Sequence, residues 1–207
     1  MFLIPWSVDV PQERWPVMNW LILVALVAIF VRQVADIIEY HAAQPDTQIQ
    51  DTRSAPRGSA TPPPRPGEPA PAKRQVIPGI TGKLMLRGWS LTGLFGYMWL
   101  HGGLAHLLGN LLFLWVFGNA VCAKIGNLRY LFLYVLFGVA AGVVHLLGTR
   151  SAVVGASGAL YGVIGMYLVL FYQNDVTCLF GLWFIVPLYV RSFTVSGIWL
   201  ILARLAW

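Results

Sequence analysis

The stretch GASGALYGVIGMYLVLFY, residues 155–172, decides the fold of this chain. It joins a turn of small residues, Gly155-Ala156-Ser157-Gly158, to an apolar run that ends near Tyr172. About 16 helical residues span roughly 24 Å, whereas the hydrocarbon core of a bilayer is about 30 Å thick, so Ser157 would lie below one membrane surface. Non-helical backbone at that depth is tolerated only where it is buried in protein or lines a water-filled cavity. The stretch therefore predicts a short membrane helix that begins at Ser157 beside a polar cavity.

The composition supports an integral membrane protein. Hydrophobic residues make up 57% of the 207 positions and charged residues only 11%, whereas soluble domains carry about 25% charged residues. The net charge is +6, but seven of the fourteen basic residues lie between Arg53 and Arg87, in or beside a Pro-rich stretch. Without a basic helix that carries interleaved aromatics, this charge indicates contact with lipid headgroups or water, and no nucleic acid. Cys122 and Cys178 lie in or beside apolar segments and read as free thiols.

Apolar runs and turn signals divide the chain into an all-α membrane fold of about five spans. Residues 1–16 lack a cleavable signal peptide and read as an N-terminal interfacial segment with tryptophans near the first span. Residues 39–84 read as a disordered extramembrane loop, because nine of the thirteen prolines fall between Pro45 and Pro78. The remaining core is 85–207. The predicted helices span 17–38, 104–121, 130–147 and 157–172, with a fifth inside 180–207.

The distribution of basic residues predicts an orientation. Lys124 and Arg129 occupy the short loop between the second and third spans, which favours a cytoplasmic loop under the positive-inside rule. The amino terminus is then cytoplasmic, and Ser157 faces the opposite side. Lys83 and Arg87 oppose this assignment because they lie close to the second span on the other side.

Three polar residues stand out in the second span and its approach. His106 and Asn110 lie four residues apart, so they share one helix face, and both carry N–H groups that can donate to an oxyanion. Alternatively, such residues simply bond a neighbouring membrane helix. His101 lies five residues before His106, at the helix entrance, where it could equally be a water-exposed or loop-bonding histidine.

Ser157 is a candidate nucleophile, although serine between small residues is also common in helix packing. A serine hydroxyl needs a base to take its proton. Gly158 and Gly162 form a Gly-x-x-x-Gly pair that permits close approach of a partner helix. Tyr161 lies on the same face as Ser157, one turn on, and could buttress an imidazole on that partner or serve only in packing.

Two separated motifs in this order resemble the rhomboid intramembrane serine proteases. The first is His101-Gly-Gly-Leu-Ala-His106-Leu-Leu-Gly-Asn110, and the second is Gly155-Ala-Ser157-Gly158. Arg87-Gly-Trp89 resembles the segment that leads into the second core helix of that family. The resemblance covers 87–171 well and 17–38 loosely, while the Pro-rich insert has no counterpart.

The resemblance implies a rhomboid-like bundle with six core helices and a serine endopeptidase that cleaves transmembrane protein substrates. Ser157 would be the nucleophile, and His106, Asn110 and the Ser157 backbone N–H would form the oxyanion hole. His101, Gly155, Gly158 and Tyr161 would support the site. No metal or cofactor is implied, and we expect a multi-pass protein of the bacterial inner membrane.

The chain departs from the family pattern at the general base. The family takes its base histidine from the sixth core helix, but the four histidines here are His41, His101, His106 and His145, and none follows Ser157. We therefore expect a sequence truncated before the sixth helix, with a natural pseudoenzyme, or His145 as a substitute base, as alternatives. A non-catalytic rhomboid-like protein that binds membrane helices is the competing function. A transporter is disfavoured because the sequence shows no inverted repeat.

Overall fold

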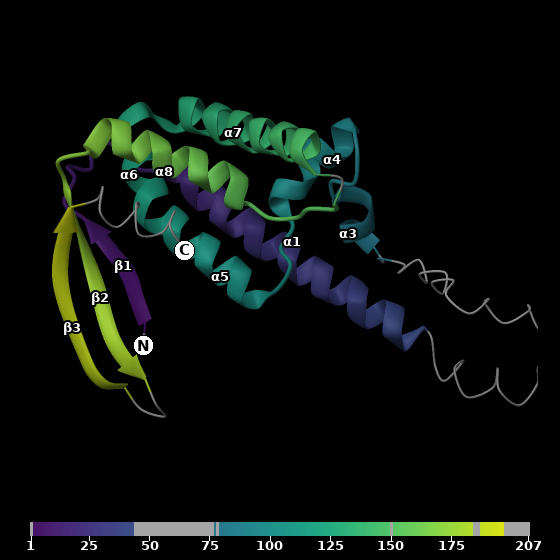
Figure 1. The fold of residues 1–207 in the computed structure, drawn as a ribbon, viewed down its shortest axis with the longest axis horizontal. Coiled ribbons are helices and arrows are strands. Elements are labelled where there is room, and N and C mark those ends of the chain that lie inside the picture. Colours follow the sequence, from purple (N-terminus) through teal and green to yellow (C-terminus); the bar gives the residue numbers. More distant parts are fainter. Residues whose placement is uncertain (1, 44–76, 78, 150, 184–186, 197–207) are drawn as a thin grey trace, which may run out of the picture.

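The computed structural model describes residues 2–43, 77, 79–149, 151–183 and 187–196. In it, helices form a bundle, and a three-stranded sheet extends from one end of that bundle (Figure 1). The core of the predicted Pro-rich loop and the last eleven residues lie outside the described residues.

Four apolar runs of the sequence form helices close to their predicted limits. In chain order these are α1 (Val17–Ala42), the continuous run α5 (Leu104–Phe113), η2 (Leu114–Gly118) and α6 (Asn119–Ile125), then α7 (Asn127–Gly148) and α8 (Ser157–Phe171). Among the described residues, three helices are long and apolar enough to cross a membrane: Val17–Ala42, Leu104–Ile125 and Asn127–Gly148. The shorter α8 is equally apolar. The helical fold of a multi-pass membrane protein is thereby confirmed.

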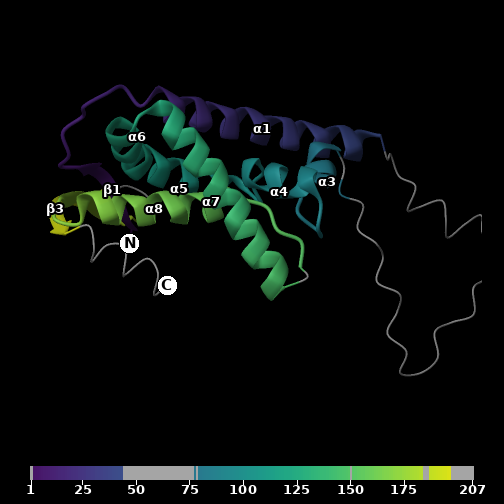
Figure 2. The ribbon, with the colours of Figure 1, turned by 90° about the horizontal axis from the view of Figure 1, so that it is seen from above.

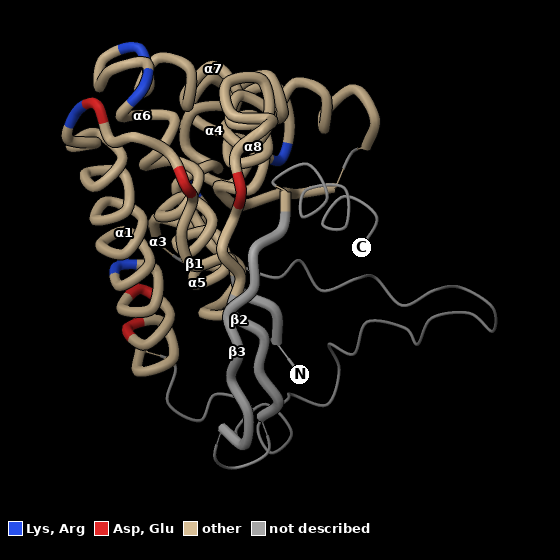
Figure 3. The backbone as a smooth tube through the Cα atoms, turned by 90° about the vertical axis from the view of Figure 1, so that its left-hand side faces the viewer, with Lys and Arg blue, Asp and Glu red and all other residues tan. Residues whose placement is uncertain are grey.

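The distribution of charge explains why the helices from α5 to α8 suit a bilayer. Neither α5 nor α8 contains a charged residue, and the charges of α6 and α7, Lys124 and Arg129, lie beside the turn that joins these two helices. Figure 3 shows Lys and Arg at the turn between α6 and α7, and it shows the charged residues of α1 in the half of that helix farther from this turn. A charged side chain at the bilayer centre costs about 2.5–3.5 kcal/mol or more, so this pattern favours membrane insertion.

Small residues bring α8 against α7 (Figure 2). A Cβ atom added at Gly162 would lie 2.2 Å from the ring of Phe137, and one added at Gly158 would lie 2.6 Å from the Cβ of Ala141. Larger residues would therefore separate the two helices. The Gly-x-x-x-Gly pair serves the close helix approach that the sequence suggested.

Hydrogen bonds from Asn19 hold the start of α1 against the second span. Its side-chain nitrogen donates to the Leu114 carbonyl and to Asn119 Oδ1, both at 2.8 Å, and Tyr130 donates to Asn19 Oδ1 at 2.6 Å. Leu114 begins the π-helical turn η2, where the regular backbone pattern changes. Asn19 is fully buried, so these bonds satisfy it in an apolar environment.

The segment before the second span folds into three short elements: α3 (Gly79–Leu84), α4 (Leu91–Gly96) and the 3₁₀ turn η1 (Tyr97–Trp99). Ser90 caps α4 by accepting from the Gly93 N–H at 3.1 Å. An antiparallel bridge joins Leu86 to Val153, with N–O distances of 3.2 and 3.0 Å. This bridge connects the lead-in segment to the turn before α8.

Two of the predicted segments differ from the structure. No fifth helix occurs in the described part of 180–207: β2 (Asp175–Trp183) and β3 (Pro187–Ser196) are antiparallel strands there, and β1 (Phe2–Val8) completes the sheet in the order β1-β2-β3. The hydropathy of an apolar run did not distinguish strand from helix. Helices occupy both ends of the predicted loop 39–84, because α1 extends to Ala42 and α3 begins at Gly79.

Candidate active site

Ser157 is the first residue of α8, and the turn before it is tied to the lead-in segment. Gly155 has φ +131°, a conformation that side chains rarely adopt, and its N–H donates to the Tyr97 carbonyl at 2.9 Å. Together with the bridge at Val153, this bond fixes the non-helical backbone that the sequence placed at membrane depth. The fifteen residues of α8 span about 22 Å, which is shorter than the hydrocarbon core.

A cavity of about 140 Å³ lies at the start of α8. Four of the predicted site residues line it, which are His106 and Asn110 from α5 and Ser157 and Tyr161 from α8. The rest of the lining is apolar or small: Ala105, Gly109, Phe113, Leu160 and Ile164. The structure thus brings the two motifs to one pocket, with a hydroxyl and two N–H-bearing side chains facing a shared space.

Gly155 fits the His106 ring closely. A Cβ atom added at Gly155 would lie 2.6 Å from His106 Cε1, 3.1 Å from His106 Nε2 and 3.5 Å from Ser157 Oγ. The imidazole therefore lies over the backbone of the turn, beside the serine. Both the positive φ and this contact require glycine at position 155.

Asn110 and His101 form a buried pair behind the cavity. Asn110 Nδ2 lies 3.0 Å from His101 Nε2, and the two residues are 5% and 3% exposed. Since an amide nitrogen can only donate, His101 accepts through a neutral Nε2. Burial, and to a lesser extent the nearby His106 ring at a centroid distance of 5.4 Å, lowers the pKa of His101 to about 4. His101 therefore contacts Asn110 and does not line the cavity.

Gln33 is a buried partner of the site that the motif analysis missed. Its Oε1 accepts from the His101 backbone N–H at 2.9 Å, and its Nε2 donates to the His101 carbonyl at 3.3 Å. A signal was present in the sequence, because Gln33 is a polar residue inside the predicted first membrane span, and such residues are functional candidates by default.

The structure places His145 away from the serine. Its Nε2 lies 3.0 Å from the Ser151 carbonyl and 3.1 Å from Thr149 Oγ1, in the turn that follows α7. His145 is not part of the cavity lining. In the part of the chain that the structure describes, no histidine hydrogen-bonds to Ser157, so the pocket presents a hydroxyl and candidate oxyanion donors without a paired base.

Comparison with known proteins identifies the family of the chain. The family model of the Rhomboid domain matches residues 88–207, more than half of the chain. The chain belongs to the rhomboid family. The match contains both motifs and begins after α1 and α3.

Three curated relatives illustrate the similarity. RHOMBOID-like protein 4 and RHOMBOID-like protein 5 of Arabidopsis thaliana are 35% and 36% identical over 98 and 105 residues, which is 47% and 46% of this chain. Rhomboid protease GluP of Bacillus subtilis (strain 168) is 36% identical over 75 residues, 36% of this chain. The chain spans 25%, 34% and 15% of the lengths of these three proteins. No solved structure matches.

Proposed function

We propose that this rhomboid-family chain carries the nucleophile and the oxyanion hole of an intramembrane serine endopeptidase whose substrates are transmembrane proteins. Ser157 attacks the scissile carbonyl. His106, Asn110 and the Ser157 backbone N–H stabilise the negative charge that develops on its oxygen. The shared 140 Å³ cavity of these three residues is the observation that carries the proposal.

The chemistry requires donors aimed at the developing charge. Asn110 Nδ2 has two N–H groups, and His101 takes one of them, which leaves the other for the cavity. Removing one such donor from an oxyanion hole typically costs about 2.7–4 kcal/mol of transition-state stabilisation. Because Asn110 is buried and bonded on one side, its remaining N–H has a fixed direction.

The serine proton must go to a base, and we propose that a further helix supplies it. The histidines that the structure describes are engaged elsewhere or, in the case of His106, lie beside the serine without a hydrogen bond to it. We take 85–207 as the catalytic core and 39–84 as an insert, with 1–16 at the membrane interface. We further propose a cytoplasmic amino terminus, because Lys124 and Arg129 lie in or beside the turn between α6 and α7. A bacterial inner membrane stays our prediction for the location.

One observation favours a second function, a non-catalytic protein that binds membrane helices. The described part of the chain pairs no base with Ser157, and a binding protein needs none. The two functions differ in whether a bound helix is cleaved.

Cleavage in proteoliposomes tests the proposal. The chain 1–207 and the same chain extended by a helix bearing histidine are mixed with a fluorescent single-span reporter. We expect near-inactivity for 1–207 and cleavage for the extended form, which Ser157→Ala abolishes and Asn110→Ala lowers by about 10- to 1000-fold. Binding without cleavage in the extended form would favour the second function. Cleavage by 1–207 that survives His106→Ala but is lost in His145→Ala would make His145 the base.

A further inference from the structure

Two buried polar residues of α1 lie outside the region that the family model matches. Gln33 and Asp36 are 4% and 5% exposed, and they lie three residues apart, on one face of the helix. The matched region begins at residue 88. Buried amides and carboxylates in a membrane helix are costly unless they are bonded, so their partners indicate what they do.

Gln33 holds the backbone of His101 through both of its polar atoms. It accepts from the His101 N–H and donates to the His101 carbonyl, and its nitrogen also donates to Thr81 Oγ1 at 3.0 Å. His101 in turn accepts from Asn110 through its ring. A chain of hydrogen bonds therefore runs from α1 through His101 to an amide that lines the cavity.

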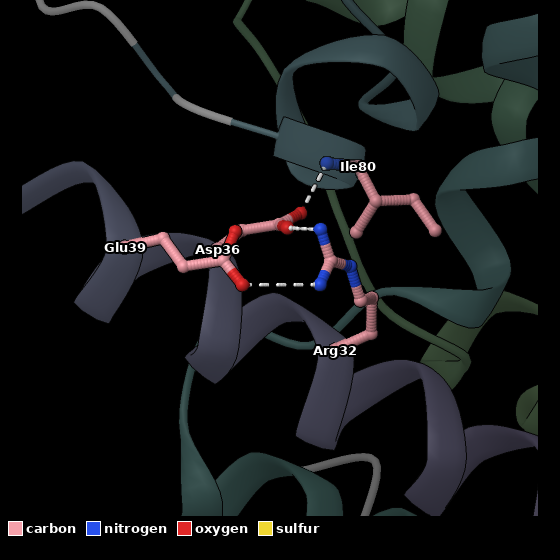
Figure 4. Close-up of polar contacts among 4 residues, drawn as sticks. All are labelled: Arg32, Asp36, Glu39 and Ile80. Atoms are coloured by element: carbon pink, nitrogen blue, oxygen red, sulfur yellow. Dashed lines mark hydrogen bonds and ion pairs between the residues drawn. The ribbon is translucent and has the colours of Figure 1, made fainter.

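Asp36 holds α3 in place one turn further along α1. Its Oδ2 accepts from the Ile80 N–H at 2.6 Å, and its Oδ1 pairs with Arg32 at 2.5 Å (Figure 4). Glu39 lies 3.4 Å from the same guanidinium. A Cβ atom added at Gly79 would lie 1.9 Å from Asp36, so α3 begins directly on this carboxylate. Because α3 carries Thr81, Asp36 also fixes the second partner of the Gln33 amide.

We infer that Gln33 is a positioning residue for the serine site, acting through His101 to orient Asn110, with Asp36 and α3 holding the Gln33 amide in place. The inference rests on the proposed function only where it calls Asn110 an oxyanion donor. Gln33→Leu would leave the His101 N–H and carbonyl without their side-chain partner. The entrance to α5 could then rotate, and the His101 ring would lose its fixed direction toward Asn110.

NMR of the histidines in the full chain, recorded in micelles, reports on the orientation of the His101 ring and does not require proteolytic activity. With ¹⁵N-labelled histidine, we expect His101 in the wild type to be a single tautomer with an unprotonated Nε2. Gln33→Leu should produce a mixture of tautomers. Gln33→Glu, which keeps an acceptor for the His101 N–H, should retain most of the wild-type signal.

Asn19→Leu is the matched control. Asn19 is as buried as Gln33 and anchors the other end of the same helix, but it contacts the second span at Leu114 and Asn119. We expect both leucine variants to lower the melting temperature, and only Gln33→Leu to alter the His101 signals. Unchanged His101 signals in Gln33→Leu, or equal changes in Asn19→Leu, would overturn the inference.

Kinetics of the extended form separate this inference from the proposed function. We expect Gln33→Leu to lower kcat by about 10- to 100-fold with little change in KM, because a displacement near 1 Å at a reacting group has that scale of effect. Gln33→Glu should recover part of the loss. If the extended wild type does not cleave at all, the proposed function fails, while the NMR comparison still decides the role of Gln33. A rise in KM alone would contradict positioning.

Discussion

Substituting Gly158 by alanine should disturb both the helix packing and the position of Ser157. A Cβ atom at residue 158 would lie 2.6 Å from the Ala141 Cβ and 3.1 Å from the hydroxyl oxygen of Tyr97. Ordinary contact begins near 3.4 Å, so α8 must move by about 0.8 Å from α7. Ser157 directly precedes residue 158 and would move with it. The cavity wall formed by α5 would stay in place, so the position of Ser157 relative to that wall would change.

The expected magnitude follows from these contacts. Overpacking costs typically about 1–3 kcal/mol of stability, and a shift near 1 Å at a reacting group lowers the rate about 100-fold. Gly165→Ala is the matched control, because a Cβ atom at Gly165 meets nothing within 4 Å. Both substitutions replace glycine by alanine in the same helix, and the gain in helix propensity is at most about 1 kcal/mol, so a lower stability of Gly158→Ala reports mainly the clash.

Thermal unfolding in detergent and reporter cleavage by the extended form measure the two effects. We expect Gly158→Ala to melt several degrees below Gly165→Ala and to cleave about 10 to 100 times more slowly. Equal melting and equal cleavage in the two variants would refute the argument, since it would show that α7 and α8 accommodate the methyl group without moving the serine.

Two further predictions concern the insert and His101. Deleting residues 44–71, which lie outside the described residues, should leave helix content and melting nearly unchanged in circular dichroism, because their composition offers little apolar surface to bury; a large loss would show that they dock on the core. Above the ordinary pKa of 6.5, His101 is neutral in both the folded and the unfolded chain. As the pH falls from 6.5 toward 4, His101 takes up a proton only in the unfolded chain, so the melting temperature should fall across this window. The fall should be smaller in His101→Gln, which lacks the titrating ring.

The sequence predicted those helices that consist of one long apolar run or that begin at a glycine-rich turn. Long apolar runs bounded by polar turns gave α1 and α7 to within a few residues, and the Gly-rich turn gave the start of α8 at Ser157. The run at 175–196 was also apolar but formed strands, because hydropathy alone does not set backbone conformation. Helices α1 and α3 occupy the two ends of the predicted loop because they contact each other, and no local sequence pattern reveals these contacts.

For the site, spacing predicted which residues share a face, and the fold determined which faces meet. His106 and Asn110 were paired from their four-residue separation, and both line the cavity with Ser157. The contact of His101 with Asn110 depends on how the loop turns before α5, and Gln33 fixes that turn from 68 residues away. Neither spacing nor composition could show this long-range bond, although a glutamine inside the predicted first membrane span was a visible signal.

A last prediction concerns the position of the sheet relative to the bilayer. Among the described residues, the order β1-β2-β3 makes β1 and β3 edge strands, and each presents a row of backbone groups without a strand partner. Such groups cost several kcal/mol each in hydrocarbon, so we expect the sheet to lie outside the hydrocarbon core and α7 to cross it. Amide exchange in lipid nanodiscs tests this. We expect outward-facing amides of Pro187–Ser196 to exchange within minutes and those in the middle of Asn127–Gly148 to stay protected. Protection of the whole 187–196 segment equal to that of α7 would contradict the argument, because only a helix or a closed barrel satisfies every backbone group inside the membrane.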